Sequence, residues 1–293
     1  MEIQEIAPAK INLAQDILFK RDDAYHEVQM VMASVDLSDY ISLVERGDDE
    51  IRVETSQAFL PDDKRNHAYQ AAKLMQAQSK HKAGVNIYIE KNIPVAAGLG
   101  GGSTDAAAVM RGLNKLWNLN LSQDTLVPLA NQIGSDVPYS LNGGTALVEG
   151  RGEIISQLPA IPYCWVILAK PAISVSTRKI FQRLRVEELD APFNASNVVE
   201  ALKKGDYSAL MVATGNALES VTFSVHPELA SLKAKMQKFG AQGVTMSGTG
   251  PTIIGFVKNQ KKGKRIYNAL KGFCDEVYLV RTQSQQFIRS TRV

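Results

Sequence analysis

The sequence predicts an α/β (α+β) protein of two domains, residues 1–156 and 157–293. A chain of 293 residues is too long for one small core and suits two domains of ordinary size. Its first half reads as strands followed by helices, whereas strands and helices alternate beyond about residue 157. Pairing of strands with helices in the second half is typical of a small α+β sandwich.

The elements of the first half follow from local patterning. Strand-like runs lie at residues 3–7, 10–18, 26–36, 39–45, 50–54 and 85–90. The last of these runs alternates apolar and polar residues, which is typical of a half-buried strand. We expect helices over residues 64–80, 103–117 and 122–134, and a glycine turn at 143–144 that leads into a further strand.

The second half opens with a proline-containing connection at 158–162 and a buried strand at 163–169. Helical stretches are expected near 177–184, 196–220 and 227–239. Three more strands are expected at 243–247, 252–257 and 276–281, with a helix at 263–271 between the last two. The change of texture places the domain boundary near residue 156.

A run of small residues at 92–108, Asn-Ile-Pro-Val-Ala-Ala-Gly-Leu-Gly-Gly-Gly-Ser-Thr-Asp-Ala-Ala-Ala, is the most informative segment. Its glycines at 98, 100, 101 and 102 carry an entropic cost that close approach of a large anion would explain. Amide N–H groups of the loop and of the following helix, which Ser103 would cap, can then point at that anion. A strand, a glycine turn and a helix in this order predict a phosphate site.

Two familiar phosphate motifs do not fit this run. A Walker A loop would close on Gly-Lys-Ser/Thr, and the dinucleotide fingerprint would need another glycine at a different offset. The alternative without function is a glycine-rich hairpin that binds no ligand, although hairpins rarely need three consecutive glycines before a helix cap.

A second glycine-rich turn spans residues 246–252, Met-Ser-Gly-Thr-Gly-Pro-Thr. Taken alone, it fits a tight hairpin between two strands as well as it fits a ligand site. Taken with the first loop, it is expected to complete the phosphate site through Ser247, Gly248, Thr249 and Gly250.

Lys10 and Asn12 share one face of a strand whose other face is apolar. Such a lysine could orient and stabilise a transferring phosphoryl group, although a strand lysine is more often exposed to solvent. Asp136 stands in a Gly/Ser turn, where its carboxylate would either cap the next helix or act as a base. Tyr25 and His26 could stack on a ring and read its edge, or simply pack.

Composition bounds the partners and the compartment. A hydrophobic content of 45%, a charged content of 22% and a net charge of +3 are those of a soluble globular protein and argue against nucleic acid. The longest apolar stretch, 161–169, is half a membrane span, and the acidic first five residues do not resemble a signal peptide. Two distant cysteines indicate a reduced, cytoplasmic protein, and the histidines lack metal-ligand spacing.

Residues 8–13, 94–108 and 246–252 resemble, in order and separation, the three motifs of the GHMP small-molecule kinases. Residues 20–27, 97–103, 113–117 and 133–139 are most similar to the branch that phosphorylates 4-diphosphocytidyl-2-C-methyl-D-erythritol in the non-mevalonate isoprenoid pathway. The resemblance implies an N-terminal domain like ribosomal protein S5 domain 2, a ferredoxin-like C-terminal domain and an active site between them.

The resemblance also implies roles for individual residues. Asp136 would take the proton of the substrate 2-hydroxyl, and Lys10 would keep Asp136 ionised and steady the developing charge. Tyr25 and Phe181 would sandwich cytosine, His26 would read its edge, and Asn12 and Thr177 would contact the substrate. ATP would lie against Asn66, Pro94, Val95, Ala96, Ala97, Gly98, Leu99, Gly100, Gly101, Gly102, Ser103 and Thr104, with Ser103 the candidate ligand for Mg²⁺.

The chain departs from the family pattern at four positions. Ala24 and Ala217 stand where the family has glycine and aspartate, and Thr104 and Thr249 replace serines. Two other functions therefore stay open: a GHMP kinase acting on homoserine or mevalonate, and a non-catalytic member of the fold that senses a ligand. The expected partners are ATP and a cytidine-diphosphate-linked polyol, and the sequence leaves a homodimer open.

Overall fold

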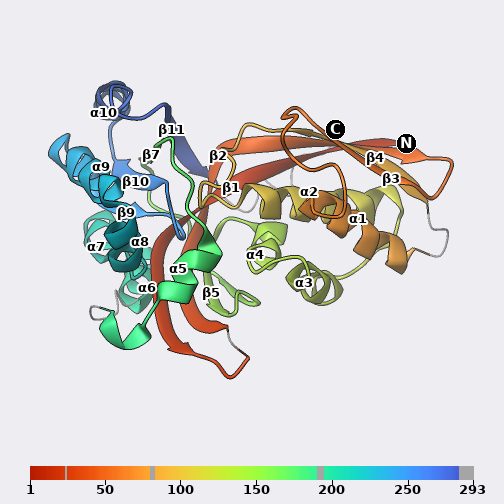
Figure 1. Cartoon of the computed structure of the whole chain (residues 1–293), viewed down its shortest axis with the longest axis horizontal. Helices are drawn as coiled ribbons and strands as arrows, with labels where there is room; N and C mark the ends of the chain where they lie inside the picture. Colours follow the sequence, from red (N-terminus) through yellow and green to blue (C-terminus); the bar gives the residue numbers. More distant parts are fainter. Residues whose placement is uncertain (24, 80–82, 190–194, 284–293) are drawn as a thin grey trace.

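The computed structural model describes residues 1–23, 25–79, 83–189 and 195–283. Two long antiparallel strands, β1 (Glu2–Lys20) and β2 (His26–Arg46), run through the whole molecule and form its spine (Figure 1). The sequence analysis expected two strands in place of each. Shifts of register, at Pro8/Lys10, Asn12/Ala14 and Ile17/Phe19, interrupt the alternation without ending the strand.

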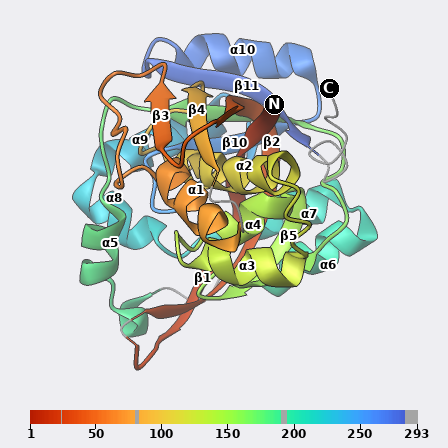
Figure 2. The same cartoon turned by 90° about the vertical axis from the view of Figure 1, so that its right-hand side faces the viewer.

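In the N-terminal half, β2 continues into a sheet with β4 (Gly84–Glu90) and β3 (Ile51–Thr55). Helices α1 (His67–Gln78), α2 (Gly101–Leu116), α3 (Gln123–Asn131) and α4 (Val137–Asn142) lie on one face of this sheet (Figures 1 and 2). Helix α2 lies at the centre of that layer, and its residues Ala106–Met110 are therefore all fully buried. Strand β5 (Thr145–Gly150) pairs with residues 28–33 of β2, and β6 (Ile154–Gln157) pairs with β5.

In the C-terminal half, β7 (Trp165–Lys170) lies between β11 (Glu276–Gln283) and β10 (Ile253–Val257), and β9 (Gln242–Met246) completes the order. Helices α9 (Pro227–Lys238) and α10 (Gln260–Leu270) pack on these strands. Helix α5 (Thr177–Arg183), followed by the turn η1 (Val186–Glu188), lies beside the β1–β2 spine (Figure 1).

The helix expected over 196–220 is wrong in its extent. The structure has α6 (Ala195–Lys204), α7 (Tyr207–Ala213), the short strand β8 (Gly215–Asn216) and α8 (Glu219–Val225) there. Gly205 adopts a left-handed conformation with φ of +63° and ends α6. Asp206 then caps α7 by accepting hydrogen bonds from the Ser208 and Ala209 amides.

Strand β11 joins the two halves. It pairs with β7 along six residues, and its last two described residues, Thr282 and Gln283, pair with Val35 and Ser34 of β2. Two hydrophobic clusters likewise contain residues of both halves. The division at residue 156 stays a prediction, since pairing and packing cross it. Among the described residues, every helix is too short or too polar to span a bilayer.

Candidate active site

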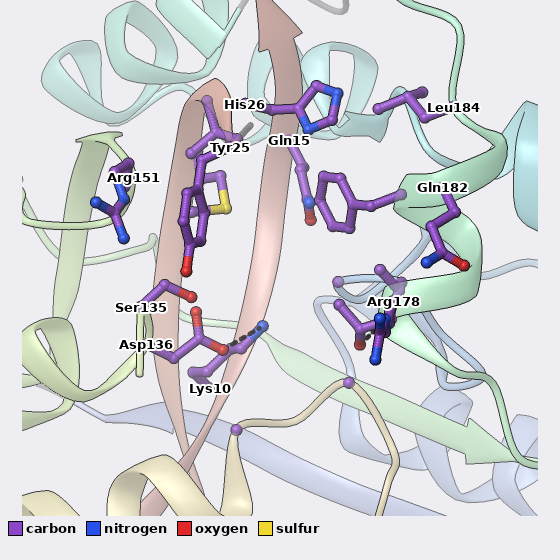
Figure 3. A pocket seen from close by; sticks show the side chains of 18 of the residues that line it. Lys10, Gln15, Tyr25, His26, Ser135, Asp136, Arg151, Arg178, Gln182 and Leu184 are labelled. Carbon is purple, nitrogen blue, oxygen red and sulfur yellow. Dashed lines mark hydrogen bonds and ion pairs between the residues drawn. The ribbon is translucent and has the colours of Figure 1, made fainter. Parts of the chain in front are cut away.

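A cavity of about 630 Å³ opens beside the β1–β2 spine (Figure 3). Ten residues predicted from the sequence line it: Lys10, Tyr25, His26, Gly98, Gly100, Asp136, Thr177, Phe181, Gly248 and Thr249. Nine further residues complete the lining: Gln15, Lys20, Val28, Met30, Ser135, Arg151, Arg178, Gln182 and Leu184. Segments more than 200 residues apart in the sequence therefore meet in one site.

The polar centre of the cavity is a buried lysine between a carboxylate and an amide. Lys10 is 4% exposed, and its Nζ lies 3.5 Å from Asp136 Oδ2 and donates a 2.7 Å hydrogen bond to Asn12 Oδ1. The Asp136 side chain stays about a quarter exposed, so the carboxylate is accessible from the cavity that it lines. A carboxylate fixed beside an ammonium group in this way is placed to accept a proton.

Asp136 does not cap a helix with its side chain. Its main chain occupies the N-cap position of α4, yet its carboxylate makes no cap hydrogen bond there. From the sequence, the carboxylate could either cap the next helix or act as a base. The structure directs the carboxylate to Lys10 instead, as the dashed line in Figure 3 marks.

The first glycine loop presses directly on the second. Gly98 has φ of +73°, and a Cβ there would lie 2.3 Å from the Ser247 carbonyl oxygen. Ser247 Oγ donates a 2.9 Å hydrogen bond to the Gly98 carbonyl, and the main-chain N–H of Asn12 donates to Ser247 Oγ at 3.3 Å. Glycine is required at 98 both by its conformation and by this close approach.

Helix α2 begins two residues earlier than expected, so Ser103 as N-cap is wrong. Gly100, with φ of +70°, is the N-cap, and Gly101 is the first helical residue. The left-handed conformation at Gly100 turns the chain into the helix without a capping side chain. Glycines 101 and 102 and Ser103 therefore form the first helical turn, whose N–H groups have no partners within the helix.

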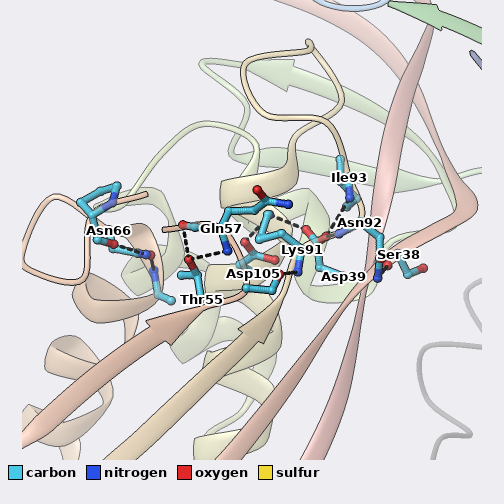
Figure 4. A network of polar contacts seen from close by, with 12 residues as sticks. Ser38, Asp39, Thr55, Gln57, Asn66, Lys91, Asn92, Ile93 and Asp105 are labelled. Carbon is cyan, nitrogen blue, oxygen red and sulfur yellow. Dashed lines mark hydrogen bonds and ion pairs between the residues drawn. The ribbon is translucent and has the colours of Figure 1, made fainter. Parts of the chain in front are cut away.

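A buried network of one lysine and two aspartates, in which burial raises the pKa of Asp105 well above its ordinary value, fastens both ends of this loop (Figure 4). Before the loop, Asp39 Oδ1 accepts hydrogen bonds from the Asn92 and Ile93 amides. After it, Asp105 of α2 binds Lys91 Nζ at 2.7 Å, and Lys91 also binds Asp39. Burial lowers the pKa of Lys91, but the two carboxylates outweigh it, and the net pKa is raised. Lys91 is thus a permanent cation that holds the loop in place.

The turn at 247–252 connects β9 to β10, which are antiparallel neighbours. The hairpin reading of this segment is therefore correct, and the same turn also lines the cavity through Gly248 and Thr249. Asn216 Nδ2 donates to the carbonyls of Met246 and Gly248 at 2.8 and 2.7 Å and fixes the turn from behind. Thr249 Oγ1 lies 2.9 Å from Thr177 Oγ1 at the start of α5.

Aromatic rings gather at the other end of the cavity. The Arg151 guanidinium carbon lies 3.8 Å from the centroid of the Tyr25 ring and covers one face of it. Figure 3 shows Tyr25 between Arg151 and the cavity, with His26 across from it. His26 in turn packs on Phe181, with ring centroids 5.3 Å apart. One ring face of Tyr25 is thus open to the cavity.

His26 is a neutral imidazole at neutral pH. Burial is the main cause that lowers its pKa, and the positive charge of Lys20 lowers it further. A neutral imidazole carries one donor and one acceptor, so it can pair with a polar ring edge. The environment therefore suits the edge-reading role expected of His26.

Several predicted site residues lie outside the cavity lining. Asn12 and Ser247 stand behind Lys10, whereas Ala97 and Leu99 point into the hydrophobic core. Asn66 caps α1 by accepting from the Ala68 amide, and its Nδ2 donates to the Pro61 carbonyl (Figure 4). The remaining ones, none of them in the lining, are Pro94, Val95, Ala96, Gly101, Gly102, Ser103, Thr104 and Gly250.

The departures from the family pattern have modest consequences where they are described. Ala217 is buried in the core, and the neighbouring Glu219 accepts hydrogen bonds from the Met246 amide and Thr245 Oγ1 and pairs with Lys233. Thr249 keeps the hydroxyl that contacts Thr177. Ala24, the expected strain point, lies outside the described residues.

The sequence analysis missed some of the residues that shape the site. Gln15, Arg151 and Arg178 line the cavity, and Asn216 supports it from the core. Gln15, Arg178 and Asn216 stand close to predicted positions, but no local pattern singles them out, and Arg151 has no motif beside it. Asn216 lies within the segment expected as one helix, which hid its place beside the second glycine turn.

Comparisons with known proteins agree with this geometry. A family model described as GHMP kinases N terminal domain matches residues 66–144, and one described as GHMP kinases C terminal matches residues 198–276. A 4-diphosphocytidyl-2-C-methyl-D-erythritol kinase of Enterococcus faecalis is 53% identical over 96% of this chain and 99% of its own.

Solved structures give the same picture at the level of the fold. A 4-(cytidine 5'-diphospho)-2C-methyl-D-erythritol kinase superposes with a TM-score of 0.81 at 30% identity, covering 96% of this chain and all of its own. A homoserine kinase from Cytophaga hutchinsonii reaches a TM-score of 0.79 at 21% identity, covering 97% and 96%. At 21% identity the similarity to the homoserine kinase shows a shared fold and says nothing about the acceptor substrate.

Proposed function

The chain belongs to the GHMP kinases, in the family of 4-diphosphocytidyl-2-C-methyl-D-erythritol kinases, and on this premise we propose its reaction. It transfers the γ-phosphoryl group of ATP to the 2-hydroxyl of 4-diphosphocytidyl-2-C-methyl-D-erythritol, a step of isoprenoid precursor biosynthesis. Membership also confirms the expected two-domain GHMP kinase fold. The observation that carries the proposal is one cavity with an ion-paired lysine at one end and open aromatic rings at the other.

In the proposed step Asp136 is the general base. Its carboxylate takes the proton of the attacking hydroxyl while that oxygen bonds to the γ-phosphorus and the bond to the ADP oxygen breaks. Lys10 Nζ, 3.5 Å from Asp136 Oδ2, orients the carboxylate and stabilises charge that develops on the transferring group. Asn12 holds the lysine in this position through their 2.7 Å hydrogen bond.

ATP is proposed to bind over the first glycine loop. The N–H groups of the first turn of α2 and its helix dipole favour the phosphates. The side chains of Ala97 and Leu99 are in the core, so in this stretch the main chain would contact the nucleotide. The adenine contact proposed for Asn66 is compatible with its cap, because its oxygen and its amide each keep further hydrogen-bonding capacity.

Magnesium is proposed to accompany ATP. The described residues contain no group of three or more acidic, histidine or cysteine side chains suited to a metal. Mg²⁺ commonly takes one or two protein ligands and completes its shell with phosphate oxygens and water, which fits this site. Ser103, in the first turn of α2, would supply one ligand. The bound ion would neutralise charge on the phosphates.

The acceptor is proposed to place its cytosine between Tyr25 and Phe181. Arg151 backs the Tyr25 ring, so a base on the open face would extend an existing stack. His26 would read the base edge, and Thr177 would contact the polar part of the substrate nearer the reacting hydroxyl. Neither homoserine nor mevalonate offers a ring for this end of the cavity.

The decisive experiment is steady-state ADP release with three acceptors offered separately: 4-diphosphocytidyl-2-C-methyl-D-erythritol, homoserine and mevalonate. We expect turnover with the first acceptor alone. Turnover with either of the others would assign the chain a different acceptor, and ATP binding without turnover of any acceptor would make it a ligand sensor.

The remaining expectations concern compartment and assembly. We propose that the enzyme acts in the cytoplasm, which agrees with two free, buried cysteines, Cys164 and Cys274. The homodimer stays a prediction, and sedimentation equilibrium of the purified chain measures it.

A further inference from the structure

The Tyr25 ring is held by few contacts of its own hairpin. It is 55% exposed, and its hydroxyl makes no hydrogen bond within the described part of the chain. The main chain there is fixed, because the Tyr25 N–H donates to Asp23 Oδ1 at 3.1 Å and the Tyr25 carbonyl accepts from the Arg21 N–H at 2.8 Å. Main-chain hydrogen bonds leave a side chain free to change its rotamer. The direction of the ring therefore depends on a residue outside the hairpin.

Arg151 supplies the missing contact from the turn between β5 and β6. Its guanidinium carbon lies 3.8 Å from the centroid of the Tyr25 ring, and its Nη1 lies 3.7 Å from Asp23 Oδ2. Arg151 Nε is buried and has no hydrogen-bond partner among the described residues, as expected of a guanidinium group that lies against an aromatic face. Asp23 thus holds the Tyr25 main chain through one carboxylate oxygen and Arg151 through the other.

The turn that carries Arg151 is itself fixed to the phosphoryl end of the cavity. The Arg151 N–H donates a 2.6 Å hydrogen bond to Glu153 Oε2. Gly152 has φ of +115°, and a Cβ there would lie 2.4 Å from the carbonyl oxygen of Ser135, the residue before Asp136. Arg151 therefore reaches the ring from a main chain that is held in place.

A ring held in this way needs no reorientation when a flat ligand stacks on it. Arg151 covers one face of the ring, and Figure 3 shows the Tyr25 side chain between Arg151 and the cavity. Ordering a side chain when a ligand binds costs free energy, so a ring that is ordered beforehand binds the ligand more tightly.

We propose that Arg151 is a positioning residue that, together with Asp23, holds the Tyr25 ring in the orientation in which the base of the acceptor stacks on it. This inference rests on the proposed function, because it takes the cytidine substrate as given. Arg151 acts through the ring and not through the phosphate groups of the acceptor. Its effect on binding therefore requires Tyr25.

The test measures equilibrium binding of cytidine and of cytidine 5'-diphosphate by calorimetry, which needs no turnover. Arg151→Ala should weaken the binding of both ligands about fivefold, the scale of one exposed cation–π contact or one ordered side chain. Lys258→Ala is the matched control, because Lys258 Nζ lies 4.5 Å from the centroid of the Tyr207 ring, and neither residue lines the cavity. It should bind both ligands as wild type does.

A second background shows whether Arg151 acts through the ring. When Tyr25→Ala is already present, adding Arg151→Ala should change neither affinity. A loss that persists in that background, or a loss confined to cytidine 5'-diphosphate, would place Arg151 on the phosphate groups and overturn the positioning role. Wild-type affinities in Arg151→Ala alone would overturn it as well. A wild-type chain that binds neither ligand overturns the proposed cytidine substrate, and this inference with it.

Discussion

At the phosphoryl end of the cavity Lys10 is 4% exposed and contacts Asn12, Asp136 and two glycine loops that press on each other. At the proposed nucleobase end Tyr25 is 55% exposed, and Arg151 covers one face of its ring. The first end joins four segments of the chain by buried hydrogen bonds and by the Lys10–Asp136 ion pair. The second is built around the connection of a hairpin.

The difference matches the task proposed for each end: phosphoryl transfer at Lys10 and Asp136, and binding of the nucleobase at Tyr25. Phosphoryl transfer depends on positions held to a fraction of an ångström, which buried and mutually packed groups provide. A base must enter and leave, and stacking tolerates a less rigid frame because rings contact over an area. Substitutions at the phosphoryl end should therefore change the rate or the fold, and those at the nucleobase end should change affinity.

The largest effect is expected from Asp136→Asn. Loss of the base should lower kcat by about a hundredfold or more, with little change in KM for ATP. The fold should persist, because the Asp136 side chain makes no cap hydrogen bond. Steady-state kinetics and a melting curve measure both, with Asp124→Asn on the surface of α3 as the control. A kcat within tenfold of wild type would contradict the assigned role.

The second prediction compares two glycines of the same loop. Gly98→Ala would force alanine into a left-handed conformation and against the Ser247 carbonyl, and should lower the free energy of unfolding by about 2 kcal/mol or more. Gly102→Ala is the matched control, because its new methyl meets only His67 Nδ1 at 3.5 Å. It should gain up to about 1 kcal/mol. Chemical denaturation measures both, and equal effects would refute the close approach at Gly98.

At the nucleobase end, Tyr25→Ala should raise KM for the cytidyl substrate about tenfold, the scale of one base stacked on an aromatic ring. The KM for ATP should stay near the wild-type value, since the proposed ATP site is at the other end. Tyr25→Phe retains the ring and should behave like wild type. An equal rise in both KM values after Tyr25→Ala would count against stacking.

The smallest effect concerns pH. Because burial lowers the pKa of His26 below its ordinary value near 6.5, the neutral form prevails at and above neutral pH. Its contribution to stability is present above that ordinary value and is lost as pH falls through the lowered pKa. The KM for the cytidyl substrate should rise a few-fold over the same window. In His26→Asn this rise should disappear, and a persisting rise would assign it to another group.

Much of the phosphoryl end could be predicted from local pattern. The strand, glycine turn and helix around residues 84–116 were expected in that order, and Lys10 and Asn12 were expected on one strand face. These features depend on neighbours in sequence, whose spacing fixes the direction of side chains. Pairing of Lys10 with Asp136 was implied by family resemblance, because 126 residues separate them in the chain.

Other parts of the site had no local signal. In a regular strand every second side chain lies on the same face, so Ala14 would share the face of Asn12. The bulge between Asn12 and Ala14 brings Gln15 to the cavity instead. Ser103 was the better N-cap by residue type, but Gly100 reaches the left-handed conformation that starts the helix. Lys91, Asp39 and Asp105 form their network across three segments, and none of them stands in a recognisable pattern.

The sequence by itself determined the order of strand, glycine turn and helix around residues 84–116 and, through family motifs, the class of reaction, and it predicted a phosphate site at the glycine run. Only the tertiary structure decided which side chains share the cavity: Tyr25 with Arg151, and His26 with Phe181. The reason is physical. Local spacing fixes a backbone conformation, whereas bulges and the packing of distant segments fix which face of a strand meets which ligand.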